Sequence, residues 1–135
     1  MSDAEQRLRA FFEANCGHAT AVYLFGSVAR GEATPASDVD VAVLFDRAPE
    51  PTLSGIQLTL QGELERYLER NVDLVVLNGA PADLVHRVLR DGVIVLDRDR
   101  SARIKFEVAK RNEFFDLEPL RRRYRRGAGS NRPTA

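Results

Sequence analysis

Apolar positions recur with a helical period at the start of the chain. The apolar residues of this segment are Ala4, Leu8, Phe11 and Phe12. Ser2 followed by Glu5 forms a capping-box pattern, and Asn15 and Gly17 both tolerate the left-handed backbone that closes a helix. The pattern therefore predicts a first helix that begins at Ser2 and stops at Asn15 to Gly17.

Four short apolar runs without helical spacing predict strands. These runs cover residues 20–25, 38–45, 71–77 and 93–96. Gly26 and Ser27 end the first run abruptly, and the residues that follow can wind a brief helix. Residues 32–38 have the composition of a loop. In the strand at 38–45, odd and even members are expected to face opposite sides of a sheet.

Helical patterns fill the spaces between and after these strands. Residues 52–70 carry an apolar stripe of Leu53, Ile56, Leu60, Leu64 and Leu68. Pro81 suits the first turn of a helix that Gly92 closes. From about Arg98 the chain is helical again, and Pro119 is expected to interrupt that helix or start a new one. The apolar residues in register there are Ile104, Val108 and Phe115. The order of elements predicts a compact domain of class α/β (α+β).

Composition narrows the class of protein. A chain of 135 residues, 44% hydrophobic and 30% charged, suits one globular domain. Lys plus Arg and Asp plus Glu both number 20, so net charge gives no argument for direct nucleic-acid binding. The single cysteine, Cys16, excludes an internal disulfide and fits a reducing compartment. No signal-peptide core and no apolar run of bilayer length (~20 residues) is found, which predicts a cytoplasmic protein without a membrane partner.

The arginines are unevenly distributed. Six fall in residues 121–132, where no acid occurs: Arg121, Arg122, Arg123, Arg125, Arg126 and Arg132. The rest of the chain then holds 14 basic and 20 acidic side chains. This asymmetry predicts a folded domain over residues 1–120 and a basic tail over 121–135, which is either a solvated terminus or a docking arm. A core this small also allows a homo- or hetero-oligomeric contact.

Asp38 and Asp40 open the second strand at positions i and i+2. Residues two apart on a strand project from the same face, so both carboxylates point into one space. Adjacent like charges repel and are costly to bury unpaired, and a divalent cation removes that cost. Ligands that are all oxygen suit Mg²⁺ or Mn²⁺. For an isolated pair, a soluble start to a strand is the ordinary alternative.

Two further features join this pair. Gly26 and Ser27, at the end of a strand, offer backbone N–H groups and a hydroxyl to a phosphate, and Arg30 on the next turn could add a charge. Asp73 lies in an otherwise apolar strand, where the alternative is a strand-end aspartate that reaches water. If its strand lies beside that of the aspartate pair, three carboxylates around two metal ions about 4 Å apart would form a nucleotidyl-transfer site.

Other polar and aromatic side chains indicate no separate site. Tyr23 and Phe25 are expected to pack in the sheet. His18 and His86 have no second histidine or cysteine at ligand spacing, so ordinary surface or core roles are favoured. Ser37 is expected to tie down the loop ahead of the aspartate pair rather than act as a nucleophile, since no histidine base is evidently placed for it.

The spacing of these residues resembles a known family. Gly-Ser, ten residues, Asp-x-Asp and a later aspartate on another strand resembles the DNA polymerase β-type nucleotidyltransferase superfamily. The short chain and the segment FEVAKRNEFFDLEPLRRRYRR are similar to its minimal nucleotidyltransferase (MNT) branch, whose members are antitoxins of HEPN/MNT toxin–antitoxin pairs. The resemblance covers roughly residues 20–125 and implies a mixed sheet flanked by helices.

The resemblance implies a role for each matching residue. The catalytic and metal-binding residues would be Asp38, Asp40 and Asp73, which would hold two Mg²⁺ or Mn²⁺ ions. The phosphates of ATP would contact Gly26, Ser27 and Arg30. Asp73 would also help to activate the attacking hydroxyl. Such an enzyme, a protein adenylyltransferase of EC 2.7.7 type, would attach AMP from ATP to a tyrosine of the HEPN toxin and release pyrophosphate.

Two other functions stay open. The chain could be a non-catalytic antitoxin that neutralises its partner by contact, although the intact aspartates favour activity because a binding surface need not retain metal ligands. It could also be a small-molecule nucleotidyltransferase that modifies antibiotics. Such enzymes usually carry an added helical substrate domain, for which 135 residues leave little room.

Overall fold

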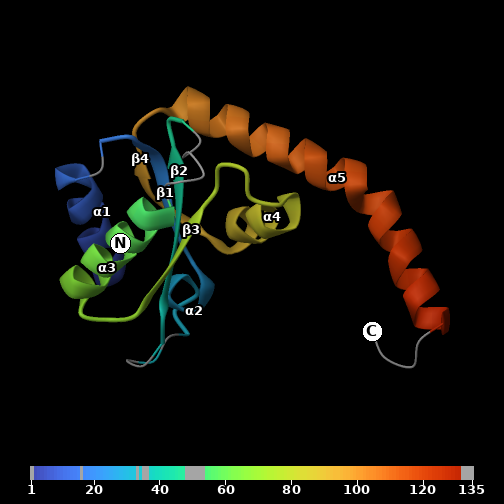
Figure 1. Cartoon of the computed structure of the whole chain (residues 1–135), viewed down its shortest axis with the longest axis horizontal. Helices are drawn as coiled ribbons and strands as arrows, with labels where there is room; N and C mark the ends of the chain where they lie inside the picture. Colours follow the sequence, from blue (N-terminus) through green and yellow to red (C-terminus); the bar gives the residue numbers. More distant parts are fainter. Residues whose placement is uncertain (1, 16, 33, 35–36, 48–53, 132–135) are drawn as a thin grey trace.

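A sheet of four strands organises the part of the chain that the structure describes, in the order β3-β2-β1-β4 (Figure 1). The strands are β1 (Ala19–Phe25), β2 (Val39–Phe45), β3 (Val72–Val76) and β4 (Val93–Asp97). β1 pairs antiparallel with β2 and β4, whereas β2 and β3 are parallel. The predicted strands and the predicted mixed sheet are confirmed.

The computed structural model describes residues 2–15, 17–32, 34, 37–47 and 54–131. For the helical residues 54–56, 117, 118 and 120–131 it describes the backbone only. The predictions about Cys16 and about the side chains of Leu53, Ile56 and the arginine tail lie outside these residues. In the described ranges, no helix combines the length and the apolar character needed to cross a membrane.

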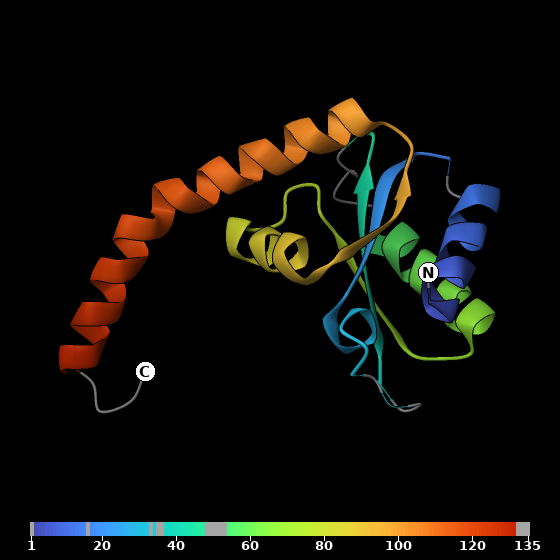
Figure 2. The same ribbon diagram turned by 180° about the vertical axis from the view of Figure 1, so that it is seen from behind.

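Helices cover both faces of the sheet (Figure 1). They are α1 (Asp3–Ala14), α2 (Gly26–Ala29), α3 (Ser54–Leu68), α4 (Ala82–Asp91) and α5 (Arg100–Asn131). α1 and α3 lie on one face, and α4 with the first part of α5 lies on the other (Figures 1 and 2). α2 is the brief helix predicted after β1, and it continues directly from the last residue of that strand.

Each face of the sheet has its own apolar core, as the alternation along the strands predicts. Val39, Val41 and Val43 of β2 pack with α1 and α3 in the first core. Ala42 and Leu44, the even members, pack in the second core with α4. The even positions of β2, Asp40 among them, therefore belong to the face that α4 and α5 cover.

The first helix is built as its sequence pattern predicts. Ser2 is the N-cap, and the Glu5 backbone N–H donates to its Oγ at 3.2 Å. Leu8 and Phe12 are fully buried, and Asn15 is the C-cap. α1 thus closes one end of the first core.

Side chains of α3 cover the outer edge of β3. The Gln57 Nε2 donates to the Leu74 carbonyl at 2.9 Å, and the Leu74 N–H donates to Gln61 Oε1 at 3.3 Å. The Val72 N–H donates to Glu65 Oε2 at 3.0 Å. These three side chains, four residues apart on one helix face, satisfy backbone groups that an edge strand leaves open. β3 is therefore held by β2 on one side and by α3 on the other.

α5 runs as one helix from Arg100 to Asn131, with Pro119 inside it. The prediction that Pro119 interrupts the helix or starts a new one is wrong. A proline removes one backbone hydrogen bond and crowds the preceding turn, which bends a helix without having to end it. α5 changes direction along its course and leads away from the body of the domain (Figures 1 and 2). The proposed boundary between domain and tail at residue 120 falls within this helix.

The apolar residues that predict α5 face solvent, not the domain. Ile104, Val108 and Phe115 are 39%, 47% and 61% exposed. The packed side of the helix carries Phe106, which joins the second core, and Phe114, whose ring stacks on His86 of α4 at 3.8 Å between centroids. The predicted helix is confirmed, and His86 has a packing role as expected.

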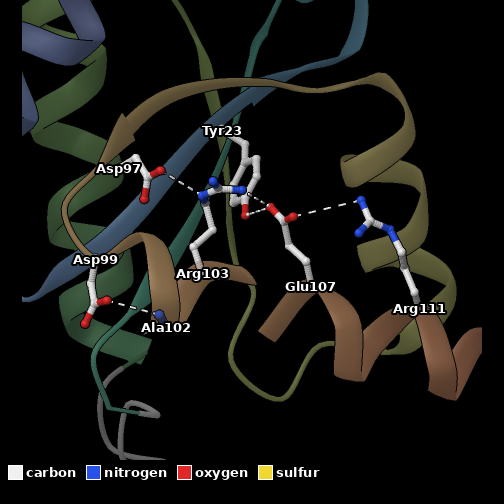
Figure 3. A network of polar contacts seen from close by, with 7 residues as sticks. All are labelled: Tyr23, Asp97, Asp99, Ala102, Arg103, Glu107 and Arg111. Atoms are coloured by element: carbon white, nitrogen blue, oxygen red, sulfur yellow. Dashed lines mark hydrogen bonds and ion pairs between the residues drawn. The ribbon is translucent and has the colours of Figure 1, made fainter. Parts of the chain in front are cut away.

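A buried polar network fastens α5 to the sheet (Figure 3). The hydroxyl of Tyr23, on β1, donates to Glu107 Oε2 at 2.7 Å. Arg103 donates from Nη1 to the same oxygen at 3.0 Å and from Nε to Asp97 Oδ2 at 2.9 Å. Tyr23 and Glu107 are 2% and 7% exposed. Tyr23 packs in the sheet as predicted, and its hydroxyl makes the additional contact with α5.

Candidate active site

Asp40 and Asp73 lie side by side on neighbouring strands. β2 and β3 are parallel, and Asp40 is in register with Asp73 across the ladder. Residues in register on adjacent strands present their side chains on the same face. Val75, two residues beyond Asp73, packs against the second core, which fixes that face as the one under α4. The condition that the sequence left open, that the third strand lies beside the second, is met.

Asp38 precedes β2 by one residue, and its carboxylate is close enough to affect Asp40. Burial raises the pKa of the Asp40 carboxyl, and the negative charges of Asp73 and then Asp38 raise it further. Asp40 is half-buried, whereas Asp38 and Asp73 are exposed. The three predicted carboxylates therefore share one electrostatic environment, with Asp40 at its centre.

Gly26 places the turn after β1 directly against Asp40. Its φ of +74° is in the left-handed region, which favours glycine. A Cβ on Gly26 would lie 2.0 Å from the Asp40 Oδ2. Phe25, the last residue of β1, is in register with Asp40 and explains the approach. Ser27 follows on α2 and is half-buried, so the predicted Gly-Ser pair begins at the contact with Asp40.

Two arginines add positive charge to this space. The charges of Arg30 and Arg87 act against the rise in the pKa of Asp40. Arg30 caps the end of α2, and its Nε also donates to Glu32 Oε2 at 3.3 Å. Arg87 lies on α4, a helix that contacts α2. The sequence predicted Arg30 near the site, but it did not single out Arg87.

No pattern in the sequence could have found Arg87. The buried positions Val85 and Val88 show which side of α4 meets the sheet. They do not show that α4 covers the face that carries the aspartates, or that α5 packs beside His86. The position of Arg87 near Asp40 follows from these two contacts between distant segments.

The loop ahead of Asp38 is closed by Ser37, as predicted. The Thr34 N–H donates to Ser37 Oγ at 2.9 Å, and the Ser37 N–H donates to the Thr34 carbonyl at 3.0 Å. The Val39 N–H then donates to the Asn71 carbonyl at 2.9 Å, where the ladder with β3 begins. These contacts fix the backbone on both sides of Asp38.

The donor set at this site fits a divalent cation shared with a nucleotide. Among the described residues, no group of three or more His, Cys, Asp or Glu side chains is arranged to hold a metal ion by itself. Mg²⁺ is commonly bound by one or two carboxylates together with substrate phosphates and water. Neighbouring aspartates, with the Gly26 turn beside Asp40 and arginine charge nearby, suit such a shared site.

The comparisons with known proteins agree with this geometry. A family model described as "Polymerase beta, Nucleotidyltransferase" matches residues 6–101, which include every candidate site residue. The chain is also similar to a protein adenylyltransferase, MntA, of Thermococcus cleftensis. The two are 40% identical over 76 residues, which is 53% of this chain and 70% of that protein.

The fold is also similar to those of solved structures of toxin–antitoxin complexes. One, described as a toxin–antitoxin with AMP-PNP, superposes with a TM-score of 0.78 at 24% identity, over 92% of this chain and 97% of that chain. Another is a tri-AMPylated HEPN toxin of Shewanella oneidensis in complex with an MNT antitoxin. Its TM-score is 0.73 at 22% identity, over 92% and 94% of the two chains.

Proposed function

This chain belongs to the family of polymerase beta nucleotidyltransferases, and from that membership we propose that it is a protein adenylyltransferase. It transfers AMP from ATP to a tyrosine of a HEPN toxin and so acts as the antitoxin. The observation that carries this proposal is the register of Asp40 with Asp73, beside the turn at Gly26.

Asp38, Asp40 and Asp73 hold the divalent cations of this reaction, Mg²⁺ or Mn²⁺, in the proposed site. When bound, such ions supply charge stabilisation at the transferred phosphoryl group and align it with the attacking oxygen. Gly26 lets the turn pass directly beside Asp40, so that backbone N–H groups of the turn and the Ser27 hydroxyl can be offered to a phosphate. Two ions are expected, since three carboxylates exceed what one nucleotide-bound Mg²⁺ commonly takes from a protein.

Proton transfer is assigned to Asp73. The tyrosine hydroxyl of the toxin attacks the α-phosphorus of ATP, a new P–O bond forms, and the bond to pyrophosphate breaks. The hydroxyl proton passes to the Asp73 carboxylate, which is exposed and so accessible to a bulky protein substrate. Arg30 and Arg87, whose charges reach Asp40, would offset the negative charge of the departing pyrophosphate.

The partner follows from the relatives. The Thermococcus cleftensis protein is named a protein adenylyltransferase, and the solved complexes pair an MNT antitoxin with a HEPN toxin. The single cysteine of this chain is in keeping with a reducing cytoplasm as the place of reaction. A protein acceptor also suits this site, because one of its aspartates is half-buried and the other two are exposed.

The test is transfer of label from α-labelled ATP to the toxin in the presence of Mg²⁺. The double variant Asp38→Asn with Asp40→Asn is expected to lose at least about 100-fold in initial rate, because amides cannot replace carboxylates as metal ligands. Asp3→Asn, on α1 at the opposite face of the sheet, is the matched control and should keep wild-type activity.

The outcomes separate the proposal from its alternative. Transfer that persists in the double variant would remove the catalytic assignment. Neutralisation of the toxin by a double variant that transfers no AMP would instead favour an antitoxin that acts by contact alone.

A further inference from the structure

Arg70 joins the end of α3 to the loop that leads into Asp38. Its Nη2 donates to the Ser37 carbonyl at 2.7 Å and to the Thr34 carbonyl at 3.1 Å. Both acceptors are backbone atoms, and Ser37 is the residue directly before Asp38. Arg70 is more than thirty residues away from these partners in the sequence, so this contact exists only in the folded chain.

Arg70 and its neighbour together bracket Asp38. Arg70 holds the peptide on one side at the Ser37 carbonyl. The Asn71 carbonyl accepts from the Val39 N–H on the other side, at 2.9 Å. Asp38 therefore lies between two hydrogen bonds, one from the Arg70 side chain and one to the Asn71 carbonyl. Its backbone cannot shift unless one of these hydrogen bonds breaks.

The segment that carries Arg70 is itself fixed. Glu69 has a φ of +55°, which is a rare left-handed conformation for a residue other than glycine. This turn lets the chain pass from Leu68, the last residue of α3, to Val72, the first of β3. The side chains of α3 hold the edge of β3, so Arg70 projects from a rigid base.

A second polar atom of Arg70 argues against a role in stability alone. Its Nε is buried and has no hydrogen-bond partner among the described residues. An unsatisfied buried donor costs about 1–3 kcal/mol. An arginine at this position is therefore a costly way to stabilise the fold, although its Nη2 reaches two carbonyls at once.

We propose that Arg70 is a positioning residue of the nucleotidyl-transfer site, which fixes the peptide ahead of Asp38 so that this carboxylate can share a cation with Asp40. The inference rests on the proposed function. Arg70 touches neither nucleotide nor cation in this role, and it acts through the backbone of the loop.

The test has two measurements on the full chain. Hydrogen exchange of the metal-free protein measures how firmly the backbone around Asp38 is held. Arg70→Met should speed exchange of the Val39 amide about tenfold or more. Electron paramagnetic resonance with a non-hydrolysable ATP analogue measures the affinity of the site for Mn²⁺. The Mn²⁺ concentration at half-saturation should rise about tenfold in Arg70→Met, because a mobile Asp38 is a poorer ligand.

Two further variants complete the design. Arg70→Lys keeps a charged donor on a long side chain and should recover part of both losses. Arg66→Met, one turn earlier on α3 at an exposed position, is the matched control and should change neither measurement. If Arg70→Met does not fold, Ser37→Ala opens the same turn by removing the acceptor of the Thr34 N–H.

The results distinguish this inference from the proposed function. A wild-type protein that binds no Mn²⁺ with the analogue would contradict the proposed function itself. Wild-type binding with unchanged Mn²⁺ affinity in Arg70→Met would overturn the positioning role alone, whatever the exchange rates show. Unchanged exchange of the Val39 amide would overturn the positioning role as well, because the Arg70 hydrogen bonds would then have no effect on the backbone around Asp38.

Discussion

At the scale of the residue, the site depends on how closely Gly26 approaches Asp40. The turn needs glycine for two separate reasons. Its φ of +74° is strained for other residues, and the space where a Cβ would stand is occupied by the Asp40 carboxylate. The first reason concerns stability, and the second concerns the position of a metal ligand.

Gly31 allows these two reasons to be separated. It has nearly the same φ, +73°, but nothing lies within 4 Å of the place of its Cβ. Gly26→Ala and Gly31→Ala should each lose about 1–2 kcal/mol in the free energy of unfolding from backbone strain. Only Gly26→Ala should also lose transfer activity, by about 100-fold, because it displaces Asp40.

Chemical denaturation and initial rates of AMP transfer measure the two effects. Equal activity of the two variants would mean that the contact between Gly26 and Asp40 has no catalytic importance.

The sequence predicted the carboxylates and the role of Ser37, but not the two arginines, Arg70 and Arg87, that lie around them. The spacing of Gly26, Ser27 and the Asp38–Asp40 pair is local, so it could be read directly. Asp73 stood out because a charge in an apolar strand needs a reason. The sequence did not single out Arg70 or Arg87. Their contacts join segments far apart in the sequence, and no local pattern encodes such a contact.

At the scale of the element, α5 shows where periodicity is a good guide and where it is not. The spacing of Ile104, Val108 and Phe115 predicts a helix, and the helix is present. The same residues would be expected to face the core, yet they are exposed. α5 is docked through Phe106 and Phe114 and through the polar contacts of Glu107 and Arg103. Hydropathy cannot identify the polar contacts (Figure 3).

The hydroxyl of Tyr23 gives this docking a pH dependence. Burial raises the pKa of Tyr23 above its ordinary value of 10.0, and its hydrogen bond to Glu107 raises it further. Above about pH 10 the unfolded chain releases this proton while the folded chain keeps it. The folded state then binds more protons, so the free energy of unfolding should fall as pH rises, by about 1.4 kcal/mol per pH unit.

Tyr23→Phe tests this linkage. At neutral pH the variant should be less stable by about 1–2 kcal/mol, because it loses a hydrogen bond to a carboxylate. Above pH 10 the difference from wild type should shrink, since the variant has no proton to release at this position. Tyr67→Phe, at a more exposed tyrosine on α3, should follow the wild-type curve. Urea denaturation across the pH range measures both, and a constant difference would contradict the assigned contact.

At the scale of the whole molecule, the two faces of the sheet have different roles: one supports the fold and the other carries the site. The face under α1 and α3 carries the larger apolar core and supports the fold. The face under α4 and α5 combines a smaller core with the aspartates at one end and the Glu107 network beside β4. The fold class could be predicted because strand alternation and helix periods are local. The site depends on the parallel pairing of β2 with β3. The sequence left this pairing open, and the structure shows it.

The central claim is that Asp38, Asp40 and Asp73 jointly bind divalent cations beside the turn at Gly26. The most direct measurement is a crystal structure with Mn²⁺ and a non-hydrolysable ATP analogue, with anomalous scattering used to locate the metal. We expect Mn²⁺ peaks within bonding distance of all three carboxylates, with the triphosphate against the Gly26 turn. Mn²⁺ bound elsewhere, or a nucleotide complex in which Asp73 points away from Asp38 and Asp40, would contradict it.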